Sequence, residues 1–249
     1  MRRYGLVGFP LSHSFSERWF NDKFRSSGIE AIYRNYPLRD PAEVRRLAIG
    51  EDLSGFNVTI PHKESIIPFL DQLDNEAEAI GAVNLVTVTG GGTDILLKGY
   101  NTDHRGFAAS LVQNGVRMPS RALALGTGGS ARAVCYALRR GGCHVQMVSR
   151  NPSGDQLGWE MLADYDIAGF DMVVNCTPVG MYPDTDAELP FPYQRLRWGQ
   201  TLYDLIYNPA ETLFLKRGKE AGCRTLNGLD MLLLQAEAGW GIWSGLNEQ

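Results

Sequence analysis

The fold of this chain is decided by residues 122–133, which read Ala-Leu-Ala-Leu-Gly-Thr-Gly-Gly-Ser-Ala-Arg-Ala. The uncharged apolar start is typical of a strand buried on both faces of a parallel sheet. The glycines that follow indicate a tight turn, and residues 130–140 have the apolar spacing of a helix. The stretch therefore predicts a strand, a turn and a helix, which is the repeating unit of an α/β fold.

The glycine loop carries the residue types that dinucleotide binding requires. Gly126 permits the tight turn, Gly128 lets the backbone approach a pyrophosphate, and Ala131 is small enough for close helix packing. The N-terminus of the next helix offers backbone N–H groups and a positive dipole to phosphates. The alternative is an ordinary glycine-rich turn. The predicted phosphate-binding loop is Gly126, Thr127, Gly128, Gly129, Ser130 and Ala131.

The end of the next strand indicates which dinucleotide is bound. NAD-binding proteins carry an Asp or Glu about 20 residues further on, which holds the ribose 2′-hydroxyl. Residues 144–151 contain no acid, and Arg150 stands between Ser149 and Asn151. A guanidinium suits a 2′-phosphate through paired hydrogen bonds, so NADP is the predicted cofactor. The alternative is that Arg150 is a surface residue, with Asp155 near enough to pair.

Short β-rich runs alternate with helical runs on both sides of the loop. This alternation predicts an α/β fold with two domains, an N-terminal mostly parallel α/β domain and a Rossmann-type dinucleotide-binding domain that carries the glycine loop, with a boundary near residue 103. Strands are expected at 3–8, 32–36, 55–60, 82–88, 95–100, 121–125, 144–148, 170–175, 201–206 and 223–226. Helices are expected at 16–27, after Pro61, at 103–113 and 130–140, after Pro209 and from Leu229.

Composition argues against several classes of protein. The 249 residues include 24 Lys and Arg against 28 Asp and Glu, a net charge of −4 that does not favour nucleic-acid binding. No stretch of about 18 apolar residues suggests a membrane span, and the apolar start is too short for a signal peptide. Four separated cysteines favour a reducing, cytoplasmic setting. Four scattered histidines give little support for a metal site.

Three polar clusters follow predicted strands in the first half of the chain. Residues 11–17 are rich in serine, residues 56–64 include Asn, Thr, Pro and Lys, and residues 100–103 end in a carboxylate. Ligands of open α/β sheets bind at the carboxyl ends of strands, where all three clusters are expected. Each cluster also has an ordinary explanation, because serine and aspartate cap helices and lysine is often an exposed helix residue.

Polar and glycine motifs extend this pattern along the whole chain. They are Ser14-x-Ser16, Asn57-Val58-Thr59-x-Pro61-x-Lys63, Gly81-Ala82-Val83-Asn84, Asn101-Thr102-Asp103, the Gly126 loop, Asn175-x-Thr177-Pro178-x-Gly180-Met181, Asp204-x-x-Tyr207-Asn208-Pro209-x-x-Thr212 and Asn227-Gly228-x-x-Met231-Leu232-x-x-Gln235-Ala236. In order and spacing they resemble the shikimate dehydrogenase family. Several are specific to that family rather than to dinucleotide-binding proteins in general.

The resemblance implies a two-domain enzyme that reduces 3-dehydroshikimate to shikimate with NADPH, on the route to chorismate and the aromatic amino acids. It implies a discontinuous substrate domain, residues 1–102 plus 228–249, and an NADP-binding domain at 103–227. It implies Lys63 and Asp103 as the catalytic pair. The implied substrate residues are Ser14, Ser16, Thr59, Asn84, Tyr207 and Gln235. The implied cofactor residues are the Gly126 loop, Ser149, Arg150, Asn151, Thr177, Met181 and Gly228.

The chemistry of these residue types agrees with the implied reaction. Hydride delivery to a ketone leaves an alkoxide, and a lysine ammonium at position 63 can stabilise that charge and donate the proton. Asp103 would hold the ammonium and a substrate hydroxyl in place. The expected partner is a small polyhydroxylated ring acid, with no nucleic acid and no membrane. Monomer and homodimer both remain open.

The chain departs from the usual family pattern at a few positions. Thr127 and Ser130 replace alanines in the glycine loop, Ser149-Arg150-Asn151 replaces Asn-Arg-Thr, and His62 replaces a phenylalanine. His62 is expected to fill the slot, and the alternatives are that it touches the substrate or tunes Lys63. Two alternatives remain, an NAD-linked quinate or shikimate dehydrogenase and a non-catalytic NADP- or shikimate-binding regulator on the same scaffold.

Overall fold

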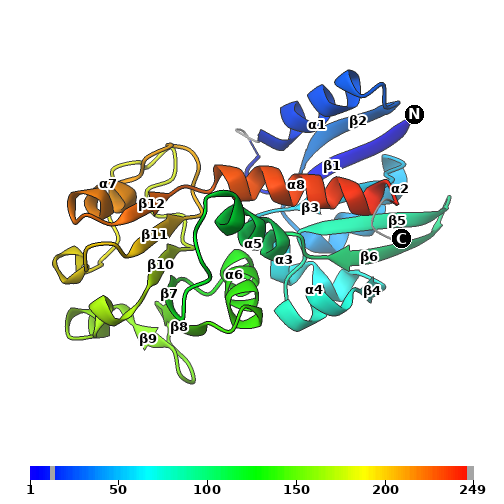
Figure 1. Ribbon diagram of the computed structural model, residues 1–249. Coiled ribbons are helices and arrows are strands. Elements are labelled where there is room, and N and C mark those ends of the chain that lie inside the picture. The colour runs from blue at the N-terminus through cyan, green and yellow to red at the C-terminus, as the bar shows by residue number, and fades with distance from the viewer. Residues whose placement is uncertain (12–14, 246–249) are drawn as a thin grey trace. The chain divides into compact units, whose positions relative to one another are not determined.

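The computed structural model describes residues 1–11 and 15–245 and divides into two compact units (Figure 1). Unit 1 comprises Met1–Thr102 and Ala236–Gln249, and unit 2 comprises Asp103–Gln235. Among the described residues, each unit is built on its own six-stranded sheet with helices against it. The predicted α/β fold is therefore confirmed.

The sheet of unit 1 is mixed, with the strand order β2-β1-β3-β5-β6-β4. Strands β2, β1 and β3 are parallel, whereas β5 runs antiparallel to both β3 and β6. The hairpin between β5 and β6 is turned by glycines, of which Gly90 and Gly92 have positive φ. The strands are β1 (Arg2–Gly8), β2 (Ala31–Pro37), β3 (Gly55–Val58), β4 (Gln72–Leu73), β5 (Leu85–Gly91) and β6 (Asp94–Tyr100).

Helices cover both faces of this sheet. Aromatic residues of α1 (Phe15–Ser26) and of the end of α8 (Leu229–Trp243) form one core with β1 and β2. Apolar residues of α2 (Val44–Gly50) and α4 (Asn75–Ile80), with Ile66 directly after α3 (His62–Ser65), contribute to the other core. The helix expected after Pro61 is only one turn long, because Pro68 cannot continue a helix and the chain turns into a 3₁₀ segment at Ile67–Phe69.

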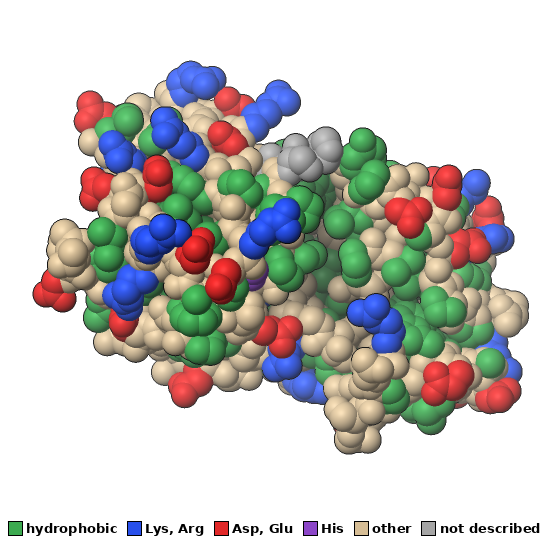
Figure 2. All heavy atoms as spheres, turned by 180° about the vertical axis from the view of Figure 1, so that it is seen from behind, with side chains coloured by type: hydrophobic (Ala, Val, Ile, Leu, Met, Phe, Trp, Pro, Cys, Tyr) green, Lys and Arg blue, Asp and Glu red, His purple; other side chains and the backbone are tan. Residues whose placement is uncertain are grey.

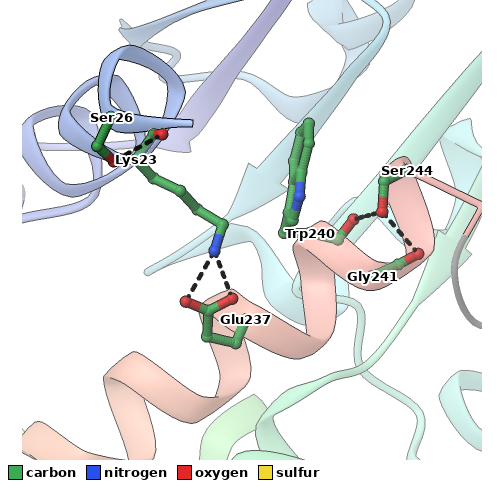
Figure 3. A network of polar contacts seen from close by, with 6 residues as sticks. All are labelled: Lys23, Ser26, Glu237, Trp240, Gly241 and Ser244. Carbon is green, nitrogen blue, oxygen red and sulfur yellow. Dashed lines mark hydrogen bonds and ion pairs between the residues drawn. The ribbon is translucent and has the colours of Figure 1, made fainter. Parts of the chain in front are cut away.

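A polar contact ties the two helices of the aromatic face together. The Lys23 ammonium on α1 lies 2.9 and 2.7 Å from the two carboxylate oxygens of Glu237 on α8 (Figure 3). Ser26 bonds back to the Lys23 carbonyl, and Ser244 bonds back to the Trp240 carbonyl. The C-terminal part of α8 is thus held in unit 1 by a charge pair as well as by aromatic packing.

The sheet of unit 2 is parallel throughout, with the strand order β12-β11-β10-β7-β8-β9. Helices α5 (Asp103–Gln113) and α6 (Gly129–Arg140) contribute to the core on one side, and α7 (Leu213–Glu220) contributes to the core on the other. The strands are β7 (Arg121–Leu125), β8 (His144–Ser149), β9 (Leu157–Gly158), β10 (Met172–Asn175), β11 (Thr201–Asp204) and β12 (Arg224–Leu226).

Helix α8 passes from one unit to the other. Its first part packs in unit 2, where Met231 joins the core that contains Phe107, and Asp230 accepts a hydrogen bond from Asn114 at 2.7 Å. Its second part packs in unit 1 through Trp240 and Trp243. The chain therefore returns to unit 1 at Ala236, inside the helix, and not at residue 228 as expected from the sequence.

Charges of both signs are interspersed on the face of the molecule shown in Figure 2. Blue and red side chains alternate there with hydrophobic and uncharged ones. This distribution agrees with the small net charge of −4.

Candidate active site

The glycine loop of unit 2 lies between β7 and α6, as the sequence predicts. Gly126 has a φ of +112°, a conformation that only glycine adopts readily, and its N–H donates to the Val148 carbonyl at 2.9 Å. Gly128 stands at the start of α6 with no side-chain cap, and a Cβ there would meet no atom within 4 Å. The loop therefore leaves room at a helix N-terminus, where phosphates bind.

The end of β8 lies beside this loop, because β8 pairs with β7 and Leu125 is in register with Val148. Ser149 is buried, and its Oγ accepts from the Asn151 N–H at 3.2 Å, which sets the turn after the strand. Arg150 between them is exposed. Asp155 has a different contact, since its backbone carbonyl accepts from Gln146 Nε2 at 2.5 Å. The open loop at a helix N-terminus and an exposed guanidinium beside it are residue types that suit a phosphorylated dinucleotide.

A buried carboxylate organises the ends of β10 and β11. Asp204 is completely buried, and it accepts from Asn175 Nδ2 at 3.0 Å, from the Ile206 N–H at 3.0 Å and from Thr212 Oγ1 at 2.6 Å. Burial raises the pKa of Asp204 to about 6, and the three hydrogen bonds oppose that rise. The carboxylate thereby joins two strand ends to the N-terminus of α7.

The same network positions Thr177, one of the implied cofactor residues. Asn175 Oδ1 accepts from the Thr177 N–H at 3.0 Å and from Thr177 Oγ1 at 2.7 Å. Thr177 Cγ2 lies 3.2 Å from the place a Cβ on Gly126 would take, so the two loops are in contact. From the sequence alone, Asn175 and Asp204 are motif residues with no predicted role. The available signal was a carboxylate directly after the apolar strand 201–203.

In unit 1 the structure brings polar residues from different strand ends together. Asn57 Nδ2 donates to the Asn84 carbonyl at 3.2 Å, and Asn84 Oδ1 accepts from the Thr102 N–H at 2.7 Å. Asn57, Asn84 and Thr102 are all buried. Thr59 follows β3 directly, and its N–H donates to the Val7 carbonyl at 2.9 Å. Hydrogen bonds thus connect the ends of β3 and β6 with the segment that enters β5.

Of the two serines implied for substrate binding, only Ser16 can be placed. It lies in the first turn of α1 and is partly buried. Ser14 lies outside the described residues.

Lys63 is held in place through its backbone and its neighbour. Its carbonyl accepts from the Val83 N–H at 2.7 Å, and its side chain is partly buried. His62 is only 3% exposed, and its Nε2 donates to the Leu38 carbonyl at 2.6 Å. The one-turn helix that carries Lys63 is therefore anchored on two sides, which gives His62 a structural use beyond filling space.

The remaining implied residues belong to unit 2. Asp103 is the first residue of α5 and is buried. Tyr207 is half-buried, and burial raises the pKa of its hydroxyl. Gln235 is partly buried on α8, with its Nε2 donating to the Leu232 carbonyl at 3.0 Å. Met181 is 39% exposed.

Comparison with known proteins adds an independent observation to this geometry. Residues 6–86 match the model of the shikimate dehydrogenase substrate binding domain. The chain is 38% identical to the shikimate dehydrogenase (NADP(+)) of Moorella thermoacetica, over 96% of this chain and 87% of that protein. The chain belongs to the shikimate dehydrogenase family.

Solved structures of shikimate dehydrogenases agree with this membership. A shikimate dehydrogenase crystallised in complex with NADP+ has a TM-score of 0.87 and 33% identity, covering 98% of this chain and 90% of its own. Shikimate 5-dehydrogenase of Thermus thermophilus, in complex with NADP(H) and shikimate, has a TM-score of 0.84 and 32% identity, covering 98% and 94%. The resemblance stated from the motifs is thereby confirmed.

Residues 1–11 and 15–245 contain no group of three or more His, Cys, Asp or Glu side chains arranged to hold a metal ion. Every helix in those ranges is too short or too polar to serve as a membrane span.

The raised pKa of Asp204 predicts a pH dependence of stability. The folded carboxyl, with a pKa of about 6, binds its proton more tightly than an unfolded carboxyl at 3.8, so its contribution to stability falls as pH rises through this window. Relative to Asp204→Asn, the wild-type free energy of unfolding should fall by about 2 kcal/mol between pH 4 and pH 7. Urea unfolding of both proteins at each pH measures this. Parallel profiles would contradict it.

Tight packing requires a glycine at position 228, whether or not a ligand is bound. A Cβ at this position would collide with the Leu205 carbonyl oxygen, and the Gly228 N–H donates to the Ile206 carbonyl at 3.0 Å. Gly228→Ala should therefore lower the free energy of unfolding by about 1–3 kcal/mol, as overpacking does. Gly50→Ala is the matched control, because a Cβ there meets no atom within 4 Å. Equal melting temperatures for the two variants would refute the expected clash.

Proposed function

We propose that this protein catalyses the NADPH-dependent reduction of 3-dehydroshikimate to shikimate, in chorismate and aromatic amino acid biosynthesis. The observation that carries the proposal is the 38% identity to a shikimate dehydrogenase (NADP(+)) over 96% of the chain. A structural relative that binds NADP(H) and shikimate, with 32% identity and a TM-score of 0.84, supports the same substrate and cofactor.

Unit 2 supplies the residues that would hold the cofactor. The loop residues 126–131 would receive the pyrophosphate at the N-terminus of α6, and Arg150 would pair with the 2′-phosphate. Ser149 and Asn151 form the turn that presents Arg150. Thr177, Met181 and Gly228 complete the proposed cofactor side. When bound, NADPH supplies the hydride for the carbonyl carbon of the substrate.

Lys63 and Asp103 are the proposed catalytic pair. As the carbonyl becomes an alkoxide, the Lys63 ammonium stabilises the negative oxygen and transfers a proton to it. Asp103 orients the ammonium and a substrate hydroxyl. In the oxidation direction Lys63 accepts the proton from the substrate hydroxyl instead.

Hydrogen-bonding side chains are the proposed means of substrate recognition. A site built on such bonds rejects analogues that lack the matching group, because its own polar atoms are then left unpaired. This requirement suits a ring acid with several hydroxyls. The proposed substrate residues are Ser14, Ser16, Thr59, Asn84, Tyr207 and Gln235.

Initial rates with purified protein test the function directly. Shikimate oxidation with NADP should greatly exceed the rates for shikimate with NAD and for quinate with either cofactor. Faster turnover of quinate with NAD would favour the NAD-linked quinate dehydrogenase instead. Binding of shikimate and NADP without turnover would indicate the non-catalytic regulator.

The thiols support the proposed cytoplasmic setting. Cys135, Cys143, Cys176 and Cys223 are all free. Burial raises the pKa of the Cys135 and Cys143 thiols to about 11, so they remain protonated and unreactive. We also propose that the protein is a monomer or a homodimer in the cytoplasm.

A further inference from the structure

Tyr33 reaches from the edge of the unit 1 sheet to the proposed substrate residues. It lies on the outermost strand β2, is fully buried, and its hydroxyl donates to Asn57 Oδ1 at 2.8 Å. Asn57 lies on β3, with β1 between the two strands. The tyrosine side chain thus crosses one strand to bond a polar group on the next.

The position of this tyrosine is fixed on every side. Asn21 of α1 clamps its backbone, accepting from the Tyr33 N–H at 2.9 Å and donating to the Tyr33 carbonyl at 2.8 Å. Phe20 stacks on its ring, with centroids 4.5 Å apart and planes 6° from parallel. A side chain held in this way presents its hydroxyl at one place and loses little further entropy when a ligand binds.

The hydroxyl touches polar groups on both of its sides. Burial raises the pKa of Tyr33 well above its ordinary value, while a hydrogen bond with the Ser16 side chain opposes the rise. The hydroxyl therefore stays protonated and remains a donor to Asn57. Asn57 in turn donates to the Asn84 carbonyl at 3.2 Å, so both ends of its carboxamide are occupied.

We propose that Tyr33 is a positioning residue for substrate binding, which acts by fixing the Asn57 carboxamide and, through it, Asn84. The inference rests on the proposed function, because Asn84 is one of the residues proposed to bind the ring acid. Without the tyrosine hydroxyl, Asn57 Oδ1 loses its donor and the carboxamide can rotate away from the Asn84 carbonyl. The affinity for substrate then falls, because recognition by hydrogen bonds depends on their orientation.

The substitution Tyr33→Phe tests this by removing one oxygen atom. The KM for shikimate should rise about fivefold, the worth of one net hydrogen bond, with kcat and the KM for NADP essentially unchanged. Tyr203→Phe is the matched control, because Tyr203 is equally buried and its hydroxyl also bonds a serine, Ser110, at 2.8 Å. An unchanged KM in Tyr33→Phe, or an equal rise in Tyr203→Phe, would overturn the proposal.

A double-mutant cycle tests whether Tyr33 acts through Asn57 or through Ser16, the other partner of its hydroxyl. Asn57→Ala should raise the KM for shikimate by itself, and Tyr33→Phe should add nothing further in the Asn57→Ala background, because Asn57 is the partner that transmits the effect. If Tyr33→Phe has its full effect in that background, the proposed route through Asn57 is wrong. Equal melting temperatures of the two tyrosine variants exclude a general loss of stability as the cause.

Calorimetric titration with shikimate separates this inference from the proposed function. If the wild-type protein binds shikimate without oxidising it, and Tyr33→Phe binds about fivefold more weakly, the positioning role stands and the catalytic function falls. If the wild type oxidises shikimate and Tyr33→Phe binds it equally well, the function stands and the positioning role falls. If the wild type neither binds nor oxidises shikimate, both are wrong.

Discussion

Lys63→Ala is expected to lower kcat for shikimate oxidation by about 10²–10⁴-fold, the range that general acid–base groups contribute, with a much smaller change in KM. The reason is that the lysine amine would interact with the reacting oxygen chiefly as its charge develops, so its loss weakens the transition state more than the bound substrate. Initial rates at saturating NADP, measured over a range of shikimate concentrations, separate the two parameters.

Two further lysine variants sharpen this test. Lys63→Arg keeps the positive charge but places there a group that gives up its proton far less readily, so kcat should remain low if proton transfer is the role. Lys98→Ala is the matched control, since Lys98 is a partly buried lysine of the same unit that contacts the Tyr100 ring. A kcat equal to wild type in Lys63→Ala would exclude the catalytic role.

Arg150→Ala is expected to lower kcat/KM for NADPH by about 10–100-fold, the worth of charge-assisted hydrogen bonds to a phosphate. The efficiency with NADH should hardly change, because NADH has a 2′-hydroxyl and no phosphate at that position. The expectation follows from the place of Arg150 two residues beyond Val148, which is paired with the start of the glycine loop. Rates of 3-dehydroshikimate reduction with each cofactor measure the difference.

The control for this variant is another arginine of unit 2. Arg139 is exposed near the end of α6, at the opposite end of that helix from the glycine loop. Arg139→Ala should leave both cofactors unaffected. An equal loss with NADPH and NADH in Arg150→Ala would mean that the guanidinium does not recognise the 2′-phosphate.

The elements with strong local signals could be predicted from the sequence. The strand 121–125 was expected at its observed bounds, and helix 130–140 begins one residue earlier than expected. Both depend on an apolar run, on glycines at a turn and on helical spacing, which act within a few residues. The short strands β4 and β9 and the helix α4 were missed, because two to six residues carry too little pattern to stand out.

Polar residues that work through distant partners could not be predicted in the same way. From the sequence, Tyr33 is an ordinary aromatic residue of a strand. Only the pairing of β2 with β1 and of β1 with β3 brings its hydroxyl to Asn57. Asp204 lies inside the strand expected at 201–206, and only the sheet places Asn175 beside it. Each contact joins residues more than 20 positions apart.

The sequence by itself determined the α/β class, the glycine turn between β7 and α6 and the family to which the chain belongs. These depend on residue type and on spacing along the chain, which are local properties. Only the tertiary structure decided that α8 belongs to both units, that His62 anchors the Lys63 helix to Leu38, and that Tyr33 bonds Asn57. Such contacts arise when folding buries polar groups, because each then requires a partner that the order of residues does not reveal.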